Sequence, residues 1–119
     1  MTDAAQDPIH RTVLLEEAVT MLAVQPGGIY VDGTFGLGGH TREILRRSAP
    51  DGKVIACEWD EDAIRLGSAA LASGQNRLQV IRENYANIDQ ALDQAGVSSV
   101  NGILIDIGLS SLQLDAGGR

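Results

Sequence analysis

The sequence predicts an α/β fold in which a parallel β-sheet carries helices on both faces. Three observations lead to this prediction. Short apolar segments alternate along the chain with segments of helical periodicity, an order typical of βαβ units. The candidate strands are almost wholly apolar, as in a parallel sheet that is buried on both faces. Turn residues, chiefly glycine, proline and aspartate, stand between several of these segments.

The first half of the chain supplies two predicted helices and one strand. Residues 12–23 form a helix whose apolar residues recur at helical spacing. These residues are Leu14, Leu15, Ala18, Met21 and Leu22. Residues 26–28, Pro-Gly-Gly, end this helix, and the short apolar strand IYVDG follows. The next helix covers residues 40–48, with Ile44 and Leu45 facing inward.

The second half repeats the same cycle. Strands are predicted at residues 53–58, 77–84 and 101–108, and helices at residues 60–72 and 85–96. Ligands of such folds bind at the carboxyl ends of the strands, beside the point where strand order reverses. The site is therefore expected among the residues that follow each strand: 32–40, 58–60, 84–85 and 106 onwards.

Length and charge restrict the class of protein. The 119 residues predict one domain, and the formal charge of −7 with a single lysine disfavours a nucleic-acid footprint on this chain. We interpret the arginines at 42, 46 and 47 as a solvated helix flank. The lone Cys57 is expected to be buried packing in a reducing compartment. No secretory leader and no apolar run of about 20 residues is apparent, so we expect a cytoplasmic protein without membrane association.

Four glycines occur within the seven residues 33–39, between a predicted strand and a predicted helix. A phosphate-binding P-loop would carry Lys and Ser or Thr where Gly39 and His40 stand, so the sequence does not match that motif. A dinucleotide fingerprint starting at Gly36 would need a third glycine, which is missing. This alternative, an NAD-dependent oxidoreductase, is weakly supported and stays open.

The pattern Asp-x-Thr-x-Gly-x-Gly, from Asp32 to Gly38, resembles the nucleoside-binding turn of class I methyltransferases that use S-adenosylmethionine. This cofactor carries no phosphate, so its loop needs no lysine. Glycines permit close approach of a ligand to the backbone and any positive φ angle that the turn requires. A purely structural glycine turn remains the alternative interpretation.

Glu58 ends the second predicted strand, 26 residues after Asp32. In nucleoside-binding βαβ units an acidic residue at this position accepts hydrogen bonds from the ribose hydroxyls. Asp60 is expected to cap the next helix. Trp59 either lines an adenine pocket or covers apolar surface. Tyr85, after the third strand, either lies against adenine or belongs to the core.

Four segments together resemble the N-terminal part of the bacterial ribosomal RNA small subunit methyltransferase H family. They are HRTVLLEEAV, YVDGTFGLGGHTREIL, EWDEDAI and GILIDIGLSSLQLD, and the match runs from His10 almost to Arg119. The resemblance implies a Rossmann-like class I methyltransferase domain, of which residues 1–119 form the N-terminal part. It also implies S-adenosyl-L-methionine as cofactor, and the N4 amine of a cytosine in small-subunit (16S) rRNA as methyl acceptor.

Carried over residue by residue, the resemblance implies a set of cofactor-binding residues. They are Gly38, Gly39, His40, Glu58, Tyr85, Asp106 and Gln113. We predict that Asp106, or backbone carbonyls beside it, holds the amine proton and turns the nitrogen lone pair toward the methyl group. No metal ligand set is predicted.

The sequence departs from the family pattern in two ways. Glu58 replaces the usual Asp, Trp59 a usual Arg and Leu112 a usual Pro, while Tyr85 stands where Phe is usual. The sequence also stops after the fourth predicted strand, before the family's helical insertion and C-terminal strands, which are expected to carry most of the RNA-binding surface. We therefore expect the short chain to be impaired or inactive, and a non-catalytic nucleoside-binding or assembly module remains an alternative.

Overall fold

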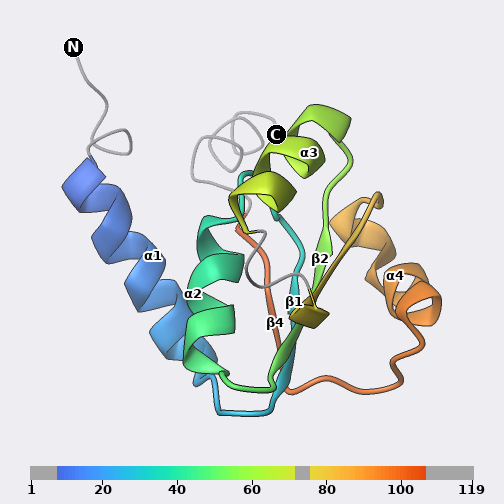
Figure 1. The fold of residues 1–119 in the computed structure, drawn as a ribbon, viewed down its shortest axis with the longest axis horizontal. Helices are drawn as coiled ribbons and strands as arrows, with labels where there is room; N and C mark the ends of the chain where they lie inside the picture. The colour runs from blue at the N-terminus through green and yellow to red at the C-terminus, as the bar shows by residue number, and fades with distance from the viewer. Residues whose placement is uncertain (1–7, 72–75, 107–119) are drawn as a thin grey trace, which may run out of the picture.

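Four parallel strands form one sheet in the order β3-β2-β1-β4. The computed structural model describes residues 8–71 and 76–106 (Figure 1). The strands are β1 (Ile29–Asp32), β2 (Lys53–Cys57), β3 (Leu78–Ile81) and β4 (Gly102–Leu104). Val31 of β1 stands opposite Ile55 on one side and Ile103 on the other. The predicted parallel sheet is confirmed.

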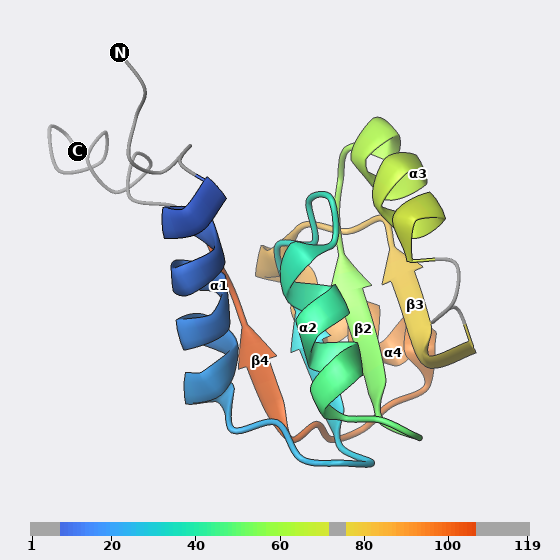
Figure 2. The same ribbon diagram turned by 60° about the vertical axis from the view of Figure 1, so that its left-hand side comes forward.

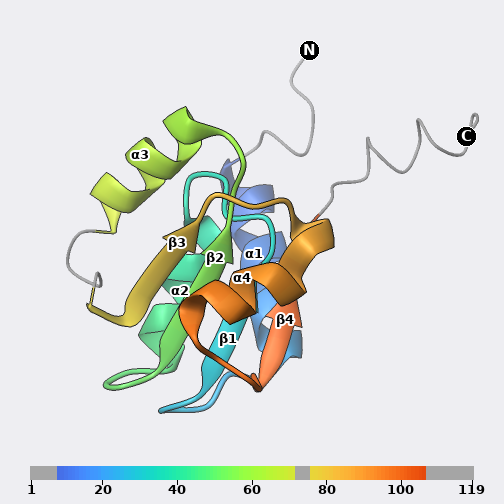
Figure 3. The ribbon, with the colours of Figure 1, turned by 90° about the vertical axis from the view of Figure 1, so that its right-hand side faces the viewer.

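Helices cover both faces of this sheet. They are α1 (Pro8–Leu22), α2 (Gly39–Arg47), α3 (Glu61–Ala70), the short 3₁₀ helix η3 (Tyr85–Asn87) and α4 (Ile88–Ala95). Figure 2 shows α1 and α2 in front of the strands, and Figure 3 shows α4 on the opposite face. This arrangement follows from the βαβ order, because each crossover places its helix over one side of the sheet.

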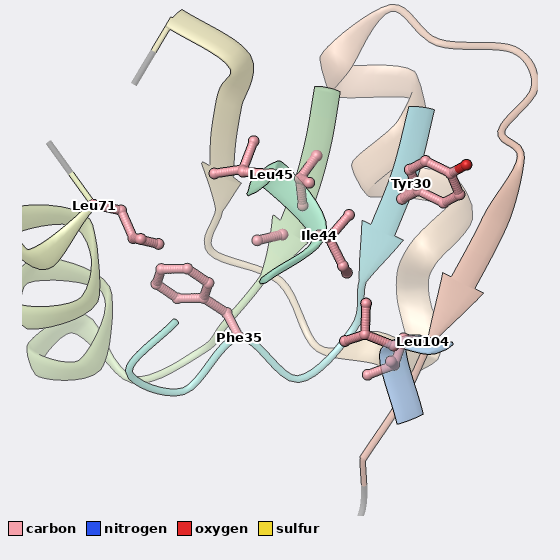
Figure 4. Close-up of a cluster of buried hydrophobic side chains, with 9 residues drawn as sticks. Tyr30, Phe35, Ile44, Leu45, Leu71 and Leu104 are labelled. Carbon is pink, nitrogen blue, oxygen red and sulfur yellow. The ribbon is translucent and has the colours of Figure 1, made fainter. Parts of the chain in front are cut away.

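Each face of the sheet packs its own apolar core, since side chains alternate along a strand. Tyr30, Val54 and Ala56 point to the α1 and α2 side, where they join Ile44 and Leu45 of α2, as predicted. Figure 4 shows this cluster, which also contains Phe35, Leu71 and Leu104. Val31, Ile55 and Cys57 point to the other side, where Ala91 of α4 covers them.

The buried face of α1 differs from the predicted one at two positions. Met21 is 82% exposed, whereas Val19, absent from the predicted apolar set, is fully buried. Steps of about 100° per residue place Val19 on the same side of the helix as Leu15 and Leu22, and they place Met21 about 120° away from Leu15, on the flank of this face. Leu15, Ala18 and Leu22 pack against the core as expected.

Several element boundaries are tighter than predicted. The predicted strand 77–84 shortens to β3, and its Gln79 is exposed because β3 is an edge strand of the described sheet. The predicted helix 85–96 begins with the 3₁₀ turn η3 before α4 starts. The predicted strand 101–108 ends at Leu104 in β4, and its last two residues lie outside the described part of the chain.

The strand order places the switch point of the sheet between β1 and β4. From β1 the chain adds β2 and β3 on one side and then crosses to add β4 on the other side. Ligands bind at the carboxyl ends of strands beside such a point. The loop after β1 and the residues after β4 therefore lie next to each other where a ligand is expected.

None of the helices within residues 8–71 and 76–106 combines the length and apolar composition that crossing a membrane requires.

Candidate functional site

The glycine loop runs from the end of β1 to the start of α2 and is fastened to the core by Phe35. This side chain is almost completely buried and points toward Leu71 (Figure 4). Its backbone N–H donates to the carbonyl oxygen of Cys57 at 3.0 Å, and its own carbonyl accepts from the N–H of Gly38 at 2.8 Å. The loop is thus held against the end of β2, and Gly36 and Gly38 turn the chain with φ angles of +56° and +91°.

The space beside most of these glycines is filled by the protein itself. A Cβ on Gly38 would lie 2.8 Å from Cδ1 of Leu71, and one on Gly39 would lie 2.9 Å from Cδ1 of Leu15. At Gly33 the nearest atom is Cγ1 of Ile105, at 2.9 Å. Sequence analysis favoured ligand approach as the reason for the missing side chains. In the structure, close packing at positions 33 and 38 and positive φ at 36 and 38 already favour glycine, while at position 39 only the end of the Leu15 side chain would have to move.

Helix α2 begins with a glycine in place of a capping side chain. Gly38 is the N-cap residue, has a left-handed backbone and offers no side-chain hydrogen bond to the helix. The first N–H groups of a helix lack intrahelical partners and attract anions. His40 lies inside the first turn and is therefore not the N-cap residue. The first turn of α2 can accept a carboxylate.

Glu58 lies at the end of β2, directly beside the glycine loop. Its Oε1 accepts a hydrogen bond from the N–H of Gly36 at 2.8 Å, and its Oε2 accepts from the N–H of Asp60 at 3.0 Å. A carboxylate has about four lone-pair positions, so each oxygen can accept one further hydrogen bond. The carboxylate is thus fixed in orientation and can still accept two ribose hydroxyls.

Asp32 is fully buried at the end of β1 and ties the loop to α2. Its Oδ1 accepts from the N–H of Thr34 at 3.1 Å, and its Oδ2 accepts from the hydroxyl of Thr41 at 2.7 Å. Burial raises the pKa of Asp32, while the hydrogen bonds from Thr41 and Thr34 oppose this shift. Both carboxylate oxygens accept hydrogen bonds from the protein itself, so Asp32 holds the loop in place. Sequence analysis did not identify Thr41, whose only signal is a hydroxyl two residues into a helix.

Asp106 follows β4 and faces the same loop. Its N–H donates to the hydroxyl oxygen of Thr34 at 2.8 Å. Its Oδ2 lies 3.9 Å from Nε2 of His40, and its side chain is 57% exposed. The carboxylate that sequence analysis assigned to catalysis is therefore accessible, and it stands beside the first turn of α2.

The aromatic residues of the site have different surroundings. Tyr85 is 40% exposed. Its Cβ lies 3.2 Å from the position that a Cβ on Gly33 would occupy, so Tyr85 borders the loop. Asn84 caps η3 by accepting from the N–H of Ala86 at 2.8 Å. Trp59 is 57% exposed, and the guanidinium of Arg82 lies 4.3 Å from its ring centroid. This cation–π contact holds the indole at the surface near the end of β2.

The carboxyl edge of the sheet thus gathers six of the seven predicted cofactor residues. They are Gly38, Gly39, His40, Glu58, Tyr85 and Asp106. The seventh, Gln113, lies outside the described residues. Asp60 caps α3 through the N–H of Asp62, as predicted. Cys57 is buried, and its burial raises the pKa of the thiol to about 11, so it remains an unreactive packing group at neutral pH.

Comparison with known proteins supplies the family. The MraW methylase family matches residues 7–119, almost the whole chain. The chain belongs to this family. Ribosomal RNA small subunit methyltransferase H of Desulfotalea psychrophila is 58% identical over 113 residues, which cover 95% of this chain and 38% of the relative. The family recognised from the sequence motifs is therefore confirmed.

Solved structures agree with the family at the level of the fold. TrmN from Thermus thermophilus is 26% identical, with a TM-score of 0.63 over 85% of this chain and 30% of TrmN. Fibrillarin from Aeropyrum pernix, crystallised with natively bound S-adenosyl-L-methionine, is 13% identical, with a TM-score of 0.62 over 78% of this chain and 41% of fibrillarin. The chain has the predicted Rossmann-like fold of class I methyltransferases.

The chain is shorter than its relatives. It spans between 34% and 38% of the length of the curated relatives compared, all named ribosomal RNA small subunit methyltransferase H. The described sheet, with the candidate site at its carboxyl edge, therefore corresponds to only a part of each of these relatives.

Proposed function

We propose that this chain is the cofactor-binding part of an S-adenosylmethionine-dependent methyltransferase that methylates the N4 amine of a cytosine in small-subunit rRNA. One observation carries the proposal: an uncapped helix N-terminus, a carboxylate fixed at the end of β2 and the accessible Asp106 meet at one edge of the sheet. Membership of the MraW methylase family and the names of the relatives support methyl transfer to small-subunit rRNA, and the resemblance of the sequence motifs suggests the N4 amine of cytosine as the acceptor.

The described residues suit this cofactor in two places. The first turn of α2, with no capping side chain on Gly38, fits the carboxylate of the methionine portion. Glu58, oriented by the N–H groups of Gly36 and Asp60, fits the ribose hydroxyls. Tyr85 borders the loop where an adenine ring would find an aromatic neighbour. The glycine loop carries no lysine, which agrees with a ligand lacking phosphate.

The proposed reaction requires little from the protein beyond alignment of the amine with the methyl group. S-adenosylmethionine, when bound, supplies a methyl group on a sulfonium leaving group. The amine of cytosine is a weak nucleophile, because its lone pair is delocalised into the ring. Asp106 would accept a hydrogen bond from this amine, orient the lone pair toward the methyl carbon and take the proton lost after transfer. Holding the reactants in line can account for several orders of magnitude in rate.

Calorimetry on the 119-residue chain tests the cofactor class. S-adenosylhomocysteine should bind with measurable heat, and NAD should neither bind nor compete with it. Preferential binding of NAD would support the oxidoreductase alternative. Binding of neither ligand would remove the proposed site.

Methyl transfer tests the reaction. The assay measures radiolabelled methyl incorporation into small subunits that lack this methylation, using the chain alone and the chain joined to the remaining part of the Desulfotalea psychrophila relative. We expect little activity from the chain alone. In the joined form, Asp106→Ala should lower activity at least about a hundredfold, as loss of a positioned proton acceptor does.

Asp93→Ala is the matched control, because Asp93 is exposed on α4, on the opposite face of the sheet. It should leave methyl incorporation unchanged. Unchanged turnover in Asp106→Ala would remove Asp106 from the mechanism. Cofactor binding without methyl transfer in the joined form would favour a non-catalytic nucleoside-binding module.

A further inference from the structure

Thr34, near the start of the glycine loop, contacts residues of two structural elements. Its backbone N–H donates to Oδ1 of Asp32 at 3.1 Å, which fixes it to the end of β1. Its hydroxyl oxygen accepts from the N–H of Asp106 at 2.8 Å, across 72 residues of sequence. The threonine therefore connects the cofactor loop to the residue that follows β4.

The Asp32 end of this connection is rigid. Asp32 is fully buried, and its second oxygen accepts from the hydroxyl of Thr41 at 2.7 Å, in the first turn of α2. A buried carboxylate is held in place because breaking either hydrogen bond would leave a polar group unsatisfied. Thr34 is thus attached to a support shared by β1 and α2.

The hydrogen bond between Thr34 and Asp106 lies just beyond the last backbone hydrogen bond between β1 and β4. The N–H of Gly33 donates to the carbonyl of Leu104 at 2.8 Å, the last backbone bond described between β1 and β4. Two residues beyond the end of β4, at Asp106, the Thr34 hydroxyl takes the place of a backbone acceptor. Without it, the residues after Leu104 would lose this side-chain restraint.

We propose that the Thr34 hydroxyl is a positioning group that sets the main chain of Asp106 relative to the cofactor loop, an inference that rests on the proposed function. The amide of Asp106 adjoins its Cα, so fixing the amide limits where the carboxylate points. That carboxylate lies 3.9 Å from His40, in the turn assigned to the methionine portion of the cofactor. The Thr34 hydroxyl thereby fixes the position of the proton acceptor, Asp106, relative to the methyl donor.

Three variants of the 119-residue chain separate this role from a loop-shaping one. Thr34→Val keeps the branched shape but removes the acceptor, and Thr34→Ser keeps the acceptor but removes the methyl group. Amide hydrogen exchange of Asp106, measured by nitrogen-15 NMR, reports directly on the hydrogen bond. Thr34→Val should raise this exchange rate about tenfold, and Thr34→Ser should restore it. Thr34→Ala, which also lacks the acceptor, replaces Thr34→Val if that variant does not fold.

Titration with S-adenosylhomocysteine supplies the second measurement. In the parent chain the ligand should shift the Asp106 amide resonance. In Thr34→Val its affinity should fall by less than about threefold, because Thr34 lies outside the assigned ligand contacts, while the Asp106 shift disappears. Thr34→Ser should show both the parent affinity and the parent shift.

Two results would overturn the proposal. One is unchanged Asp106 exchange in Thr34→Val, which would mean that the hydroxyl does not restrain this amide. The other is an equal loss of affinity in Thr34→Val and Thr34→Ser, which would mean that the side chain shapes the loop. If the parent chain bound no S-adenosylhomocysteine, the proposed function would fail, whereas Asp106 exchange in the free variants would still test the link to Thr34.

Discussion

Gly38 shows how one residue serves both the turn and the packing around it. Its φ angle of +91° lies in the region that side chains disfavour, and Leu71 and Phe35 fill the space where a Cβ would stand. The same residue begins α2 without a capping side chain. Leu71 and Phe35 of the hydrophobic core therefore stabilise the conformation of Gly38 that leaves the first turn of α2 without a capping side chain.

Gly38→Ala should destabilise the chain more than a positive φ angle alone explains. The left-handed backbone costs about 1–2 kcal/mol for alanine, and the contact with Leu71 adds to it, so we expect a loss of about 2–3 kcal/mol in the free energy of unfolding. Urea unfolding followed by circular dichroism measures this loss.

Gly96→Ala is the matched control for this substitution. Gly96 has a φ angle of +72° with no atom within 4 Å of its Cβ position, so only the backbone cost of about 1–2 kcal/mol should appear. Equal losses at the two positions would show that Leu71 moves aside freely, and that packing does not restrict position 38.

At the scale of elements, the buried face of α1 was harder to predict than its position in the sequence. α1 covers β4 and α2 with a narrow stripe in which Val19 is fully buried and Met21 is not. Its apolar residues surround more of the helix than this stripe uses, so the periodicity allowed more than one buried face. Contact with the sheet selected the one that contains Val19.

Substitutions in α1 test this choice of face. Val19→Ala removes two buried methyl groups from the core and should cost about 2 kcal/mol of unfolding free energy. Met21→Ala removes more atoms, but at an exposed position, and should change stability by less than about 0.5 kcal/mol. Thermal unfolding of both variants checks the order, and a larger loss from Met21→Ala would contradict the described packing of α1.

At the scale of the whole molecule, the net charge bears on whether this chain could bind RNA. The chain carries a formal charge of −7. Within the described residues, many arginines are already paired: Arg46 and Arg47 with Glu43, Arg65 with Asp62 and Arg82 with Glu61. Phosphate binding needs cations free to replace counterions. We therefore expect the described residues to contribute little to RNA binding, in keeping with the proposed function.

RNA binding by the isolated chain should accordingly be weak. Filter binding to small-subunit rRNA should show at least about tenfold lower affinity for the chain than for the form joined to the remainder of the relative, together with a shallower dependence on salt. Equal affinity and an equal salt slope would place the RNA surface on the chain itself. Arg42, which is exposed on α2, would then be the first residue to substitute.

Local pattern was sufficient for the order of the elements and for the burial of the central strands, whereas the cofactor-binding roles of the candidate site residues stay predictions. Periodicity and strand-end position depend on neighbours in sequence, so these features are readable without a structure. The sequence also identified Glu58 and Asp106 as acids at strand ends, because an apolar strand that ends in a carboxylate is a local signal.

Only the tertiary structure decided which strand ends adjoin. The placement of β4 beside β1 brings Asp106 to the hydroxyl of Thr34, 72 residues away. Likewise, Leu71 and Leu15 lie beside Gly38 and Gly39, where local pattern does not place them. Such contacts depend on how helices and strands pack in three dimensions. Many chain paths are compatible with one pattern of apolar residues, and burial of both sheet faces selects among them.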